Sequence, residues 1–307
     1  MEDPTGKTDP GAVRSLDSVE TVGIVGLGLI GGSLARALKE APGGSGRPAA
    51  GSEAPRIVAS TLDRGDLDRA VREGVVDRGV EDAAEVASEA DLLVYATPLD
   101  ATLVLLEAHR DRIRSDAVVT DVVSLKLPVA RKIRELGLQE RWVGGHPMAG
   151  SEQSGFGAAR SDLFRGAPVF LVRGDARGSA AGVVESLWIR ARSEPRWVDA
   201  EAHDHRMIWA SHLPQLVANA LAACLEEAGV SPEDLGPGGR DMTRLAASTP
   251  ELWKGLLKAG GSGEIESLES IIAELEEITR LLSVGDSEAM EDYMQATRRW
   301  REGEDRS

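Results

Sequence analysis

The chain has 307 residues, of which 42% are hydrophobic and 28% charged, and its formal net charge at pH 7 is −16. These values are typical of a soluble globular protein of about two domains, and they exclude a disordered chain, a fibre and a small disulfide scaffold. Nucleic acids and anionic membranes are bound through basic surface, so the acidic balance argues against both partners. No apolar stretch approaches the ~18 residues of a membrane span.

The only cysteine, Cys224, excludes an internal disulfide and a cysteine-rich metal site. A single thiol suits a reducing compartment, and the polar N-terminus shows no signal peptide. We therefore expect a cytoplasmic protein without a metal. Residues 1–18 contain Pro4, Pro10 and Gly11 and predict a flexible tail.

Short apolar runs alternate with helical stretches between residue 19 and about residue 175. A β-rich run at 19–25 leads into a glycine-rich loop and a helix that extends to Glu40. Residues 41–56 are rich in Gly, Pro and Ala, which predicts a flexible surface insertion. Further buried strands are predicted at 57–59, 92–96, 118–122, 142–144 and 169–172, with helices near 67–73 and 103–113. This alternation predicts an α/β fold with a doubly wound parallel sheet.

Beyond about residue 175 the pattern becomes helical. Helices are predicted at 180–191, 203–228, 248–259 and 265–282. We therefore expect a tail at 1–18, a dinucleotide-binding domain at 19–175 and an all-helical domain at 176–307. The helical half carries several amphipathic faces, and its own core needs only one of them, so we expect a homodimer built mainly from this half.

The strongest local signal is the motif Gly26-x-Gly28-x-x-Gly31, which follows a strand and opens a helix. Gly26 allows a tight turn, Gly28 lets the backbone approach a pyrophosphate, and Gly31 lets helix and strand pack closely. The helix N-terminus adds free N–H groups and a positive dipole end. Other residues expected at the cofactor are Leu29, Ile30 and Thr97. The alternative is a glycine-rich turn that binds nothing.

The end of the second strand leaves the choice of nicotinamide cofactor open. Asp63 could hold a ribose 2′-hydroxyl, which favours NAD, whereas Thr61 with Arg64 could accept a 2′-phosphate, which favours NADP. Asp63 could instead cap the helix through Asp66. We lean to NAD, because no arginine directly follows Thr61.

Two polar residues, Ser124 and His146, follow later strands of the predicted sheet. In a doubly wound sheet, ligands bind outside the carboxyl ends of the strands, where the glycine loop also lies. An imidazole can take a proton near neutral pH, so His146 is a candidate general base. Ser124 could orient it or bind the same substrate hydroxyl; the alternative for Ser124 is a helix N-cap.

Two further segments lie in the helical half. Pro214 interrupts an apolar helix beside His212 and Gln215 and brings polar groups to a bend, although the segment could simply be a capped break. Arg244 follows a glycine-rich loop and suits a bidentate contact with a carboxylate. Alternatively, Arg244 pairs with Asp241 on a solvated helix end.

Taken together, these segments resemble the prephenate/arogenate dehydrogenases of tyrosine biosynthesis. The resemblance rests on Gly-Leu-Gly-Leu-Ile-Gly-Gly-Ser at 26–33, Gly-His-Pro-Met-Ala-Gly-Ser-Glu at 145–152, Ser-His-Leu-Pro at 211–214 and Asp-Met-Thr-Arg at 241–244. It implies a Rossmann domain, a helical domain that forms a homodimer, and oxidative decarboxylation of prephenate with hydride transfer to a nicotinamide.

The resemblance also implies roles for single residues. His146 would accept the proton of the ring hydroxyl, Ser124 would bind that hydroxyl, and Arg244 would bind a substrate carboxylate. Other residues implied in the substrate pocket are Ser151, Glu152, His212, Gln215 and Trp253. Two departures matter: Gln215 stands where many relatives carry a histidine, and Thr61 stands where relatives carry an aspartate. The first leaves prephenate and arogenate open as substrates, and the second weakens the inference of NAD.

Two other functions remain open. A nicotinamide-binding regulatory protein could share the glycine loop but would have no need for His146, Ser124 and Arg244 together. A 3-hydroxyacid-type dehydrogenase usually relies on a lysine in its helical domain. The lysines after residue 176 are Lys254 and Lys258, which lie outside an obvious site motif.

Overall fold

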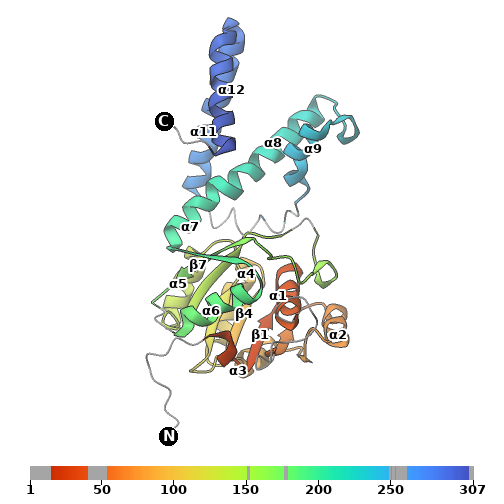
Figure 1. Cartoon of the computed structure of the whole chain (residues 1–307), viewed down its shortest axis with the longest axis vertical. Helices are drawn as coiled ribbons and strands as arrows, with labels where there is room; N and C mark the ends of the chain where they lie inside the picture. The colour runs from red at the N-terminus through yellow and green to blue at the C-terminus, as the bar shows by residue number, and fades with distance from the viewer. Residues whose placement is uncertain are drawn as a thin grey trace, which may run out of the picture. The chain divides into compact units, whose positions relative to one another are not determined.

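A computed structural model of the chain describes residues 15–40, 54–150, 153–175, 179–248, 250, 253 and 261–303. The chain divides into two compact units (Figure 1). The first comprises Met1–Met207 with Arg244–Ala259 and is called the sheet unit below. The second comprises Ile208–Thr243 with Gly260–Ser307 and is called the helical unit.

The sheet unit is built on one eight-stranded sheet with the order β3-β2-β1-β4-β5-β6-β7-β8. The strands are β1 (Thr21–Val25), β2 (Arg56–Ser60), β3 (Arg78–Gly79), β4 (Leu92–Tyr95), β5 (Val118–Asp121), β6 (Trp142–Pro147), β7 (Pro168–Arg173) and β8 (Glu194–Val198). Neighbouring strands are parallel except β6 and β7, which are antiparallel. The reversal of strand order at β1 and β4 makes the sheet doubly wound, as predicted, and creates the crevice where such sheets bind ligands.

Helices cover both faces of this sheet (Figure 1). They are α1 (Leu29–Lys39), α2 (Arg64–Arg72), α3 (Ala83–Glu89), α4 (Leu99–His109), α5 (Leu127–Glu135), α6 (Ser179–Arg190) and α7 (Ala200–Met207). Successive strand residues point to opposite faces, so Ile24 and Val25 belong to different buried clusters. Burial of each such aliphatic side chain stabilises the fold by about 1.5–3 kcal/mol.

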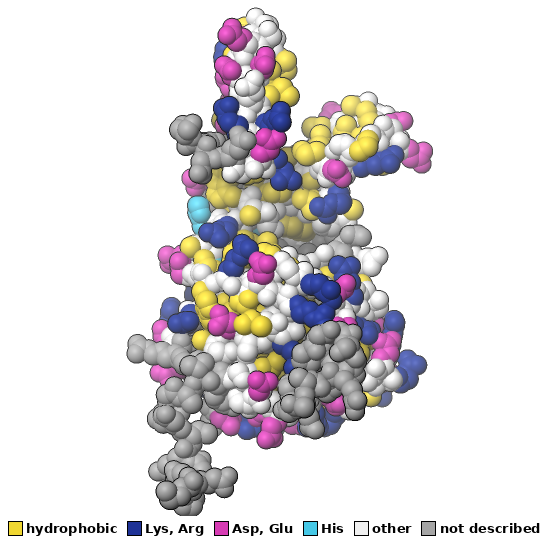
Figure 2. Space-filling model, in the orientation of Figure 1, with side chains coloured by type: hydrophobic (Ala, Val, Ile, Leu, Met, Phe, Trp, Pro, Cys, Tyr) yellow, Lys and Arg dark blue, Asp and Glu magenta, His cyan; other side chains and the backbone are white. Residues whose placement is uncertain are grey.

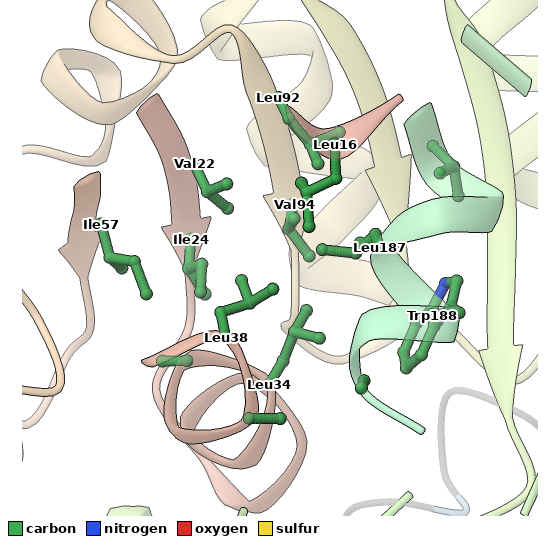
Figure 3. Packing of buried hydrophobic residues seen from close by; sticks show 14 of the residues in the cluster. Leu16, Val22, Ile24, Leu34, Leu38, Ile57, Leu92, Val94, Leu187 and Trp188 are labelled. Carbon is green, nitrogen blue, oxygen red and sulfur yellow. The ribbon is translucent and has the colours of Figure 1, made fainter. Parts of the chain in front are cut away.

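The cluster on one face joins the sheet to α1 and α6 (Figure 3). The α1 side chains Leu34 and Leu38 are fully buried there, four residues apart on one side of the helix. From α6, Leu187 and Trp188 are equally buried. The sheet and these two helices therefore hold the glycine loop between β1 and α1 on a rigid base.

The sheet extends further along the chain than the sequence predicts. Both α6 and β8 follow residue 175, and β8 pairs in parallel with β7. The run Glu194–Val198 is only partly buried and carries Glu, Pro and Arg, so it lacks the apolar pattern of the central strands. The sequence also misses β3, α3 and α5, and in the helical unit α9 (Pro237–Thr243) and α12 (Ser287–Glu302).

The prediction of a flexible tail over residues 1–18 is wrong for residues 15–18, because Ser15 caps a short 3₁₀ turn, Leu16–Ser18. Leu16 is 6% exposed and packs in the α1/α6 cluster. Its backbone N–H donates to Ser186 Oγ at 2.7 Å. Residues 1–14 and most of the predicted insertion, 41–53, lie outside the described residues.

The helical unit contains α8 (Leu213–Glu227), α9 (Pro237–Thr243), α11 (Ser262–Val284) and α12 (Ser287–Glu302). A π-helical turn, Ile208–His212, precedes α8, and Pro214 sits in the first turn of α8. The predicted break at Pro214 therefore takes the form of a π turn, since proline lacks the N–H that the preceding turn would need.

Hydrophobic side chains lie exposed on the helical unit (Figure 2). The described residues include thirteen exposed large hydrophobics, of which nine belong to this unit. Contrary to the expectation from the sequence, the helical run Ala200–Glu227 has the length and composition of a membrane span, with a mean hydropathy of 1.2 over its most apolar window. Only 17% of that window is buried. Length and composition alone are weak evidence for a membrane, and a subunit interface has the same need for exposed apolar surface.

Candidate active site

The glycine loop has the geometry of a phosphate cradle. Gly26 has a φ of +100°, and a Cβ there would lie 2.4 Å from the carbonyl oxygen of Ala96. A Cβ at Gly31 would lie 2.0 Å from the carbonyl oxygen of Gly26. Gly28, the N-cap of α1, faces open space, with nothing within 4 Å of its Cβ position. The first turn of α1 therefore offers backbone N–H groups to an anion that can approach closely.

Leu29 and Ile30 form that first turn, and both are half-buried against the α1/α6 cluster. Thr97 follows β4, and its Oγ1 is 2.8 Å from Thr102 Oγ1. Thr102 Oγ1 also donates to the backbone oxygen of Thr97 at 3.0 Å. The residues predicted at the cofactor from β1 and β4 thus lie at the carboxyl ends of adjacent strands.

The end of β2 carries the residues that bear on the cofactor's ribose. Asp63 is the N-cap of α2, and its Oδ1 accepts the N–H of Asp66 at 2.9 Å, as the alternative interpretation predicts. Arg64 forms an ion pair of 2.6 Å with Glu81, in which both side chains are largely exposed. Such an exposed pair is weak and leaves the guanidinium available to another anion.

His146 lies within β6 rather than after it. The pairing of β5 with β6 stops at Asp121 and Gly144, so Gly145 and His146 extend beyond the end of β5. On the other side, His146 is opposite Phe170 of β7. His146 is only 9% exposed. Ser124 follows β5 and is half-buried, and the N-cap of α5 is Lys126, so Ser124 does not serve as a helix cap.

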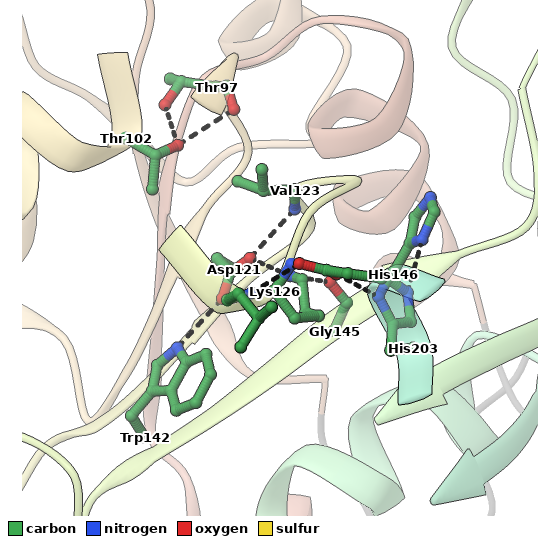
Figure 4. Close-up of polar contacts among 11 residues, drawn as sticks. Thr97, Thr102, Asp121, Val123, Lys126, Trp142, Gly145, His146 and His203 are labelled. Carbon is green, nitrogen blue, oxygen red and sulfur yellow. Dashed lines mark hydrogen bonds and ion pairs between the residues drawn. The ribbon is translucent and has the colours of Figure 1, made fainter. Parts of the chain in front are cut away.

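A chain of three side chains begins at His146, and Figure 4 shows its first two members, His146 and His203. His146 Nδ1 is 2.9 Å from His203 Nε2. His203 Nδ1 is in turn 2.7 Å from Asp204 Oδ1. His203 is completely buried and Asp204 is 8% exposed. The candidate base is therefore connected to a buried carboxylate through a second imidazole.

Asp204 is held by the start of α5. Its Oδ1 accepts the backbone N–H of Lys126 at 2.7 Å, and its Oδ2 accepts that of Leu127 at 2.9 Å. These N–H groups belong to the first turn of α5, where no intrahelical partner exists. The positive end of the helix dipole also favours a carboxylate there.

A buried ion pair supports the same edge of the sheet. Lys126 Nζ contacts Asp121 Oδ1 and donates to the carbonyl oxygen of Gly145 at 2.6 Å (Figure 4). Asp121 also accepts from Trp142 Nε1 at 3.0 Å and from the N–H of Val123 at 3.0 Å. Burial lowers the pKa of Lys126, while the Asp121 carboxylate opposes that shift. The pair links β5, β6 and the α5 N-terminus directly before His146.

Of the remaining predicted residues, Trp253 and Arg244 belong to the sheet unit. Trp253 is half-buried and packs against the second hydrophobic cluster of the sheet unit. Arg244 begins a 3₁₀ turn and is exposed. Within the described part of the chain Arg244 forms no ion pair, so the alternative pair with Asp241 is not observed. Ser151 and Glu152 lie outside the described residues.

His212 and Gln215 belong to the helical unit. His212 is 1% exposed, and its Nδ1 is 3.0 Å from Glu264 Oε1. Glu264 also accepts the N–H of Gly261 at 2.7 Å. Gln215 is 3% exposed and donates to Asn219 Oδ1 at 3.1 Å. Both predicted residues are thus buried polar groups with partners inside their own unit.

Four residues of this site escaped the sequence analysis: Asp121, Lys126, His203 and Asp204. The available signals were a carboxylate inside the apolar run of β5 and two histidines flanking an aspartate at 203–205. Neither signal identifies a partner, because Lys126 and Asp204 are 78 positions apart. Among the described residues, no group of three or more His, Cys, Asp or Glu could hold a metal ion.

Comparison with known proteins bears directly on this site. The chain matches the family model "Prephenate dehydrogenase, nucleotide-binding domain" over residues 52–191 and "Prephenate dehydrogenase, dimerization domain" over residues 199–296. The chain belongs to the prephenate dehydrogenase family. Prephenate dehydrogenases are oxidoreductases, and the nucleotide-binding family model covers β2 to α6 of the sheet unit. This agrees with the resemblance found in the sequence.

Individual relatives extend over nearly the whole chain. A prephenate dehydrogenase of Bacillus subtilis is 30% identical and aligns with 92% of this chain and 76% of its own length. The structure of an A. aeolicus prephenate dehydrogenase in complex with hydroxyphenyl propionate and NAD+ has a TM-score of 0.82 and 25% identity, covering 93% of this chain and 98% of that one. A Synechocystis arogenate dehydrogenase has a TM-score of 0.75 and 25% identity, covering 92% and 99%. The relatives therefore include enzymes named for either substrate.

Proposed function

We propose that this protein is an NAD-dependent prephenate dehydrogenase that converts prephenate to 4-hydroxyphenylpyruvate. The observation that carries the proposal is the position of His146. This buried imidazole lies at the same sheet edge as the phosphate cradle and is anchored through its Nδ1. Membership of the prephenate dehydrogenase family supports the same reaction. Arogenate is the second candidate substrate, because it shares the ring and a structural neighbour is named for it.

In the proposed reaction His146 acts as the general base. It removes the proton of the ring hydroxyl through Nε2, while Ser124 binds the same hydroxyl. Loss of this proton drives the departure of hydride from the carbon that bears the oxygen. The ring then loses its carboxylate as CO2 and becomes aromatic. A positioned base contributes about 10²–10⁴-fold to such a rate.

The nicotinamide supplies the hydride acceptor. The cradle of Gly26, Gly28 and Gly31 would hold its pyrophosphate at the N-terminus of α1, with Leu29, Ile30 and Thr97 beside it. At the end of β2, Thr61 and Asp63 would face the ribose. The Asp63 oxygen that does not cap α2 can accept a ribose hydroxyl, and no arginine directly follows Thr61, so we propose NAD over NADP.

For the substrate, Arg244 is proposed as the carboxylate ligand, because a guanidinium grips a carboxylate through two parallel hydrogen bonds. Further substrate contacts are proposed for Ser151, Glu152, His212, Gln215 and Trp253. We also propose a cytoplasmic homodimer that associates through the helical unit and needs neither nucleic acid nor a membrane. The dimerization family model over residues 199–296 supports this assembly.

A four-way turnover assay tests the function. Prephenate and arogenate are each supplied with NAD and with NADP, and kcat/KM is measured for every pair. We expect the highest value for prephenate with NAD. A preference of tenfold or more for NADP would contradict the proposed cofactor, and a preference for arogenate would contradict the proposed substrate. Absence of turnover with all four pairs would favour a non-catalytic nicotinamide-binding protein.

A further inference from the structure

We propose that His203 and Asp204 are positioning residues that hold His146 in the one tautomer able to act as a base. This inference deepens the proposed function and rests on it where activity is measured. It assigns a role to two buried residues through a chain of short contacts, 2.9 Å from His146 to His203 and 2.7 Å from His203 to Asp204.

The chain of contacts determines where each proton sits. A carboxylate can only accept hydrogen bonds, so His203 must present its Nδ1–H to Asp204. In the neutral ring, His203 Nε2 is then an acceptor, and His146 must present its own Nδ1–H to it. The lone pair of His146 is consequently on Nε2, the nitrogen that takes the substrate proton.

The surroundings leave little freedom for another arrangement. His203 is fully buried, with the rings of His146 and Phe170 edge-on to it at centroid distances of 5.1 Å and 5.6 Å. Asp204 is clamped by two backbone N–H groups of α5, so its carboxylate cannot turn away without leaving them unsatisfied. The position of His146 is thereby linked to the folded α5 N-terminus.

The same chain stabilises the charge that His146 acquires on proton uptake. Asp204 provides the negative charge that faces the imidazolium through His203. The other charged groups nearby are Lys126 and Asp121, which neutralise each other, and Arg206, whose guanidinium lies 5.6 Å above the Phe170 ring. Removal of the Asp204 charge therefore disfavours protonated His146.

The first test replaces the carboxylate by Asp204→Asn, which keeps the size of the side chain. We expect kcat to fall by about 100-fold or more, since the wrong tautomer of a catalytic histidine is severely impaired. We also expect the acidic limb of the kcat/KM profile to move to lower pH, whereas a structural defect alone would leave its midpoint unchanged. A variant within threefold of wild-type kcat, with an unshifted profile, would overturn the proposal.

The second test compares two substitutions of His203. In His203→Gln an amide oxygen replaces Nε2 as a fixed acceptor for His146, whereas His203→Leu offers no acceptor. We expect His203→Gln to retain kcat within about tenfold of wild type and His203→Leu to lose about 100-fold or more. Equal activity of the two variants would contradict a tautomer role. NAD affinity and circular dichroism serve as folding controls for both.

A third measurement is independent of turnover. The chain has five histidines, so their ring ¹⁵N signals can be assigned with single-histidine variants. We expect neutral His146 to carry its proton on Nδ1 in the wild type and to lose that preference in Asp204→Asn. A wild-type His146 protonated on Nε2 would overturn the inference. If instead the tautomer is as expected but prephenate and arogenate both fail to react, the proposed function fails and the positioning role survives.

Discussion

The sheet unit and the helical unit differ in how much hydrophobic side chain each of them buries. The sheet unit buries two large hydrophobic clusters, one on each face of its sheet. In the described part of the helical unit the buried hydrophobic residues are Ala218 and Leu281. Because hydrophobic burial is the main favourable contribution to folding, the sheet unit has a core of its own, and the helical unit depends on further contacts.

One face of α11 shows what such contacts require. Ile265, Ile272, Leu275 and Leu282 recur at intervals of seven, three and seven residues and are all more than half exposed. This spacing places them on one side of the helix, as in the seam of a coiled coil. The buried residues of the same helix, Glu264, Ser267 and Leu281, lie off this stripe. A second copy of the chain is the partner we propose for it.

The largest effect on the free energy is expected from a charge placed in the exposed stripe of α11. Ile272→Glu places a charge in the proposed interface, and twofold symmetry repeats the loss at both copies. At about 1.5–3 kcal/mol per buried isoleucine, association should weaken by about 3–6 kcal/mol. Sedimentation should then show monomers at micromolar concentration. Val104→Glu, at an exposed site of the sheet unit, is the control and should remain dimeric. An unchanged dimer of Ile272→Glu would remove this stripe from the interface.

The next effect concerns the buried ion pair of the sheet unit. Lys126→Met leaves Asp121 charged and without its cation, which should destabilise the protein by about 3–5 kcal/mol in chemical denaturation. Lys132→Met is the matched control, since Lys132 pairs with Glu107 and Glu135 at the surface and should cost at most about 1 kcal/mol. An equal loss of stability in the two variants would mean that the buried ion pair does not stabilise this edge of the sheet.

A third variant, Arg244→Gln, addresses the point where the chain returns from the helical unit to the sheet unit. Loss of one partner of a desolvated charge pair costs about 2–5 kcal/mol. KM for prephenate should therefore rise tenfold or more, with a smaller change in kcat, because the contact exists before the transition state. Arg240→Gln, at an exposed site of α9, should leave KM unchanged. A KM within twofold of wild type would end the role of Arg244 as carboxylate ligand.

The smallest effect is a pH dependence confined to the sheet unit. Burial lowers the pKa of His109, whose Nδ1 is 3.1 Å from the buried hydroxyl of Tyr95. The folded state therefore favours the neutral ring. Below pH ~6.5, the ordinary pKa of histidine, the unfolded chain binds a proton that the folded protein does not, so the stability is complete above this pH and declines as the pH falls. The free energy of unfolding should decrease by at most about 1.4 kcal/mol per pH unit below that point. His109→Gln should flatten this slope between pH 7.5 and 5.5. A slope that persists in the variant would assign the dependence to other groups.

Local sequence patterns are enough to predict those elements of the fold that depend on interactions between neighbouring residues. The central strands β1, β2, β4, β5 and β6 are apolar runs between turn signals, and all were predicted near their observed positions. The glycine motif has the same character, because Gly26 adopts a positive φ and Gly31 lies against the carbonyl oxygen of Gly26 in the same turn. Short or partly polar elements such as β3 and β8 escaped prediction, since pairing with a neighbour rather than composition makes them strands.

The sequence by itself determined the sheet, the cofactor loop and the choice of His146 as the candidate base. Strand patterns and the conformation of glycine depend on a few neighbouring residues, so they can be recognised in the sequence. Only the tertiary structure decided what surrounds His146. It joins His203, 57 positions away, to the imidazole and brings Asp204 to the first turn of α5. It also decided that Lys126 is buried in contact with Asp121 and with the carbonyl oxygen of Gly145, 19 positions away. These partners are chosen by packing of distant segments, in which any of several polar residues could satisfy the same hydrogen bond.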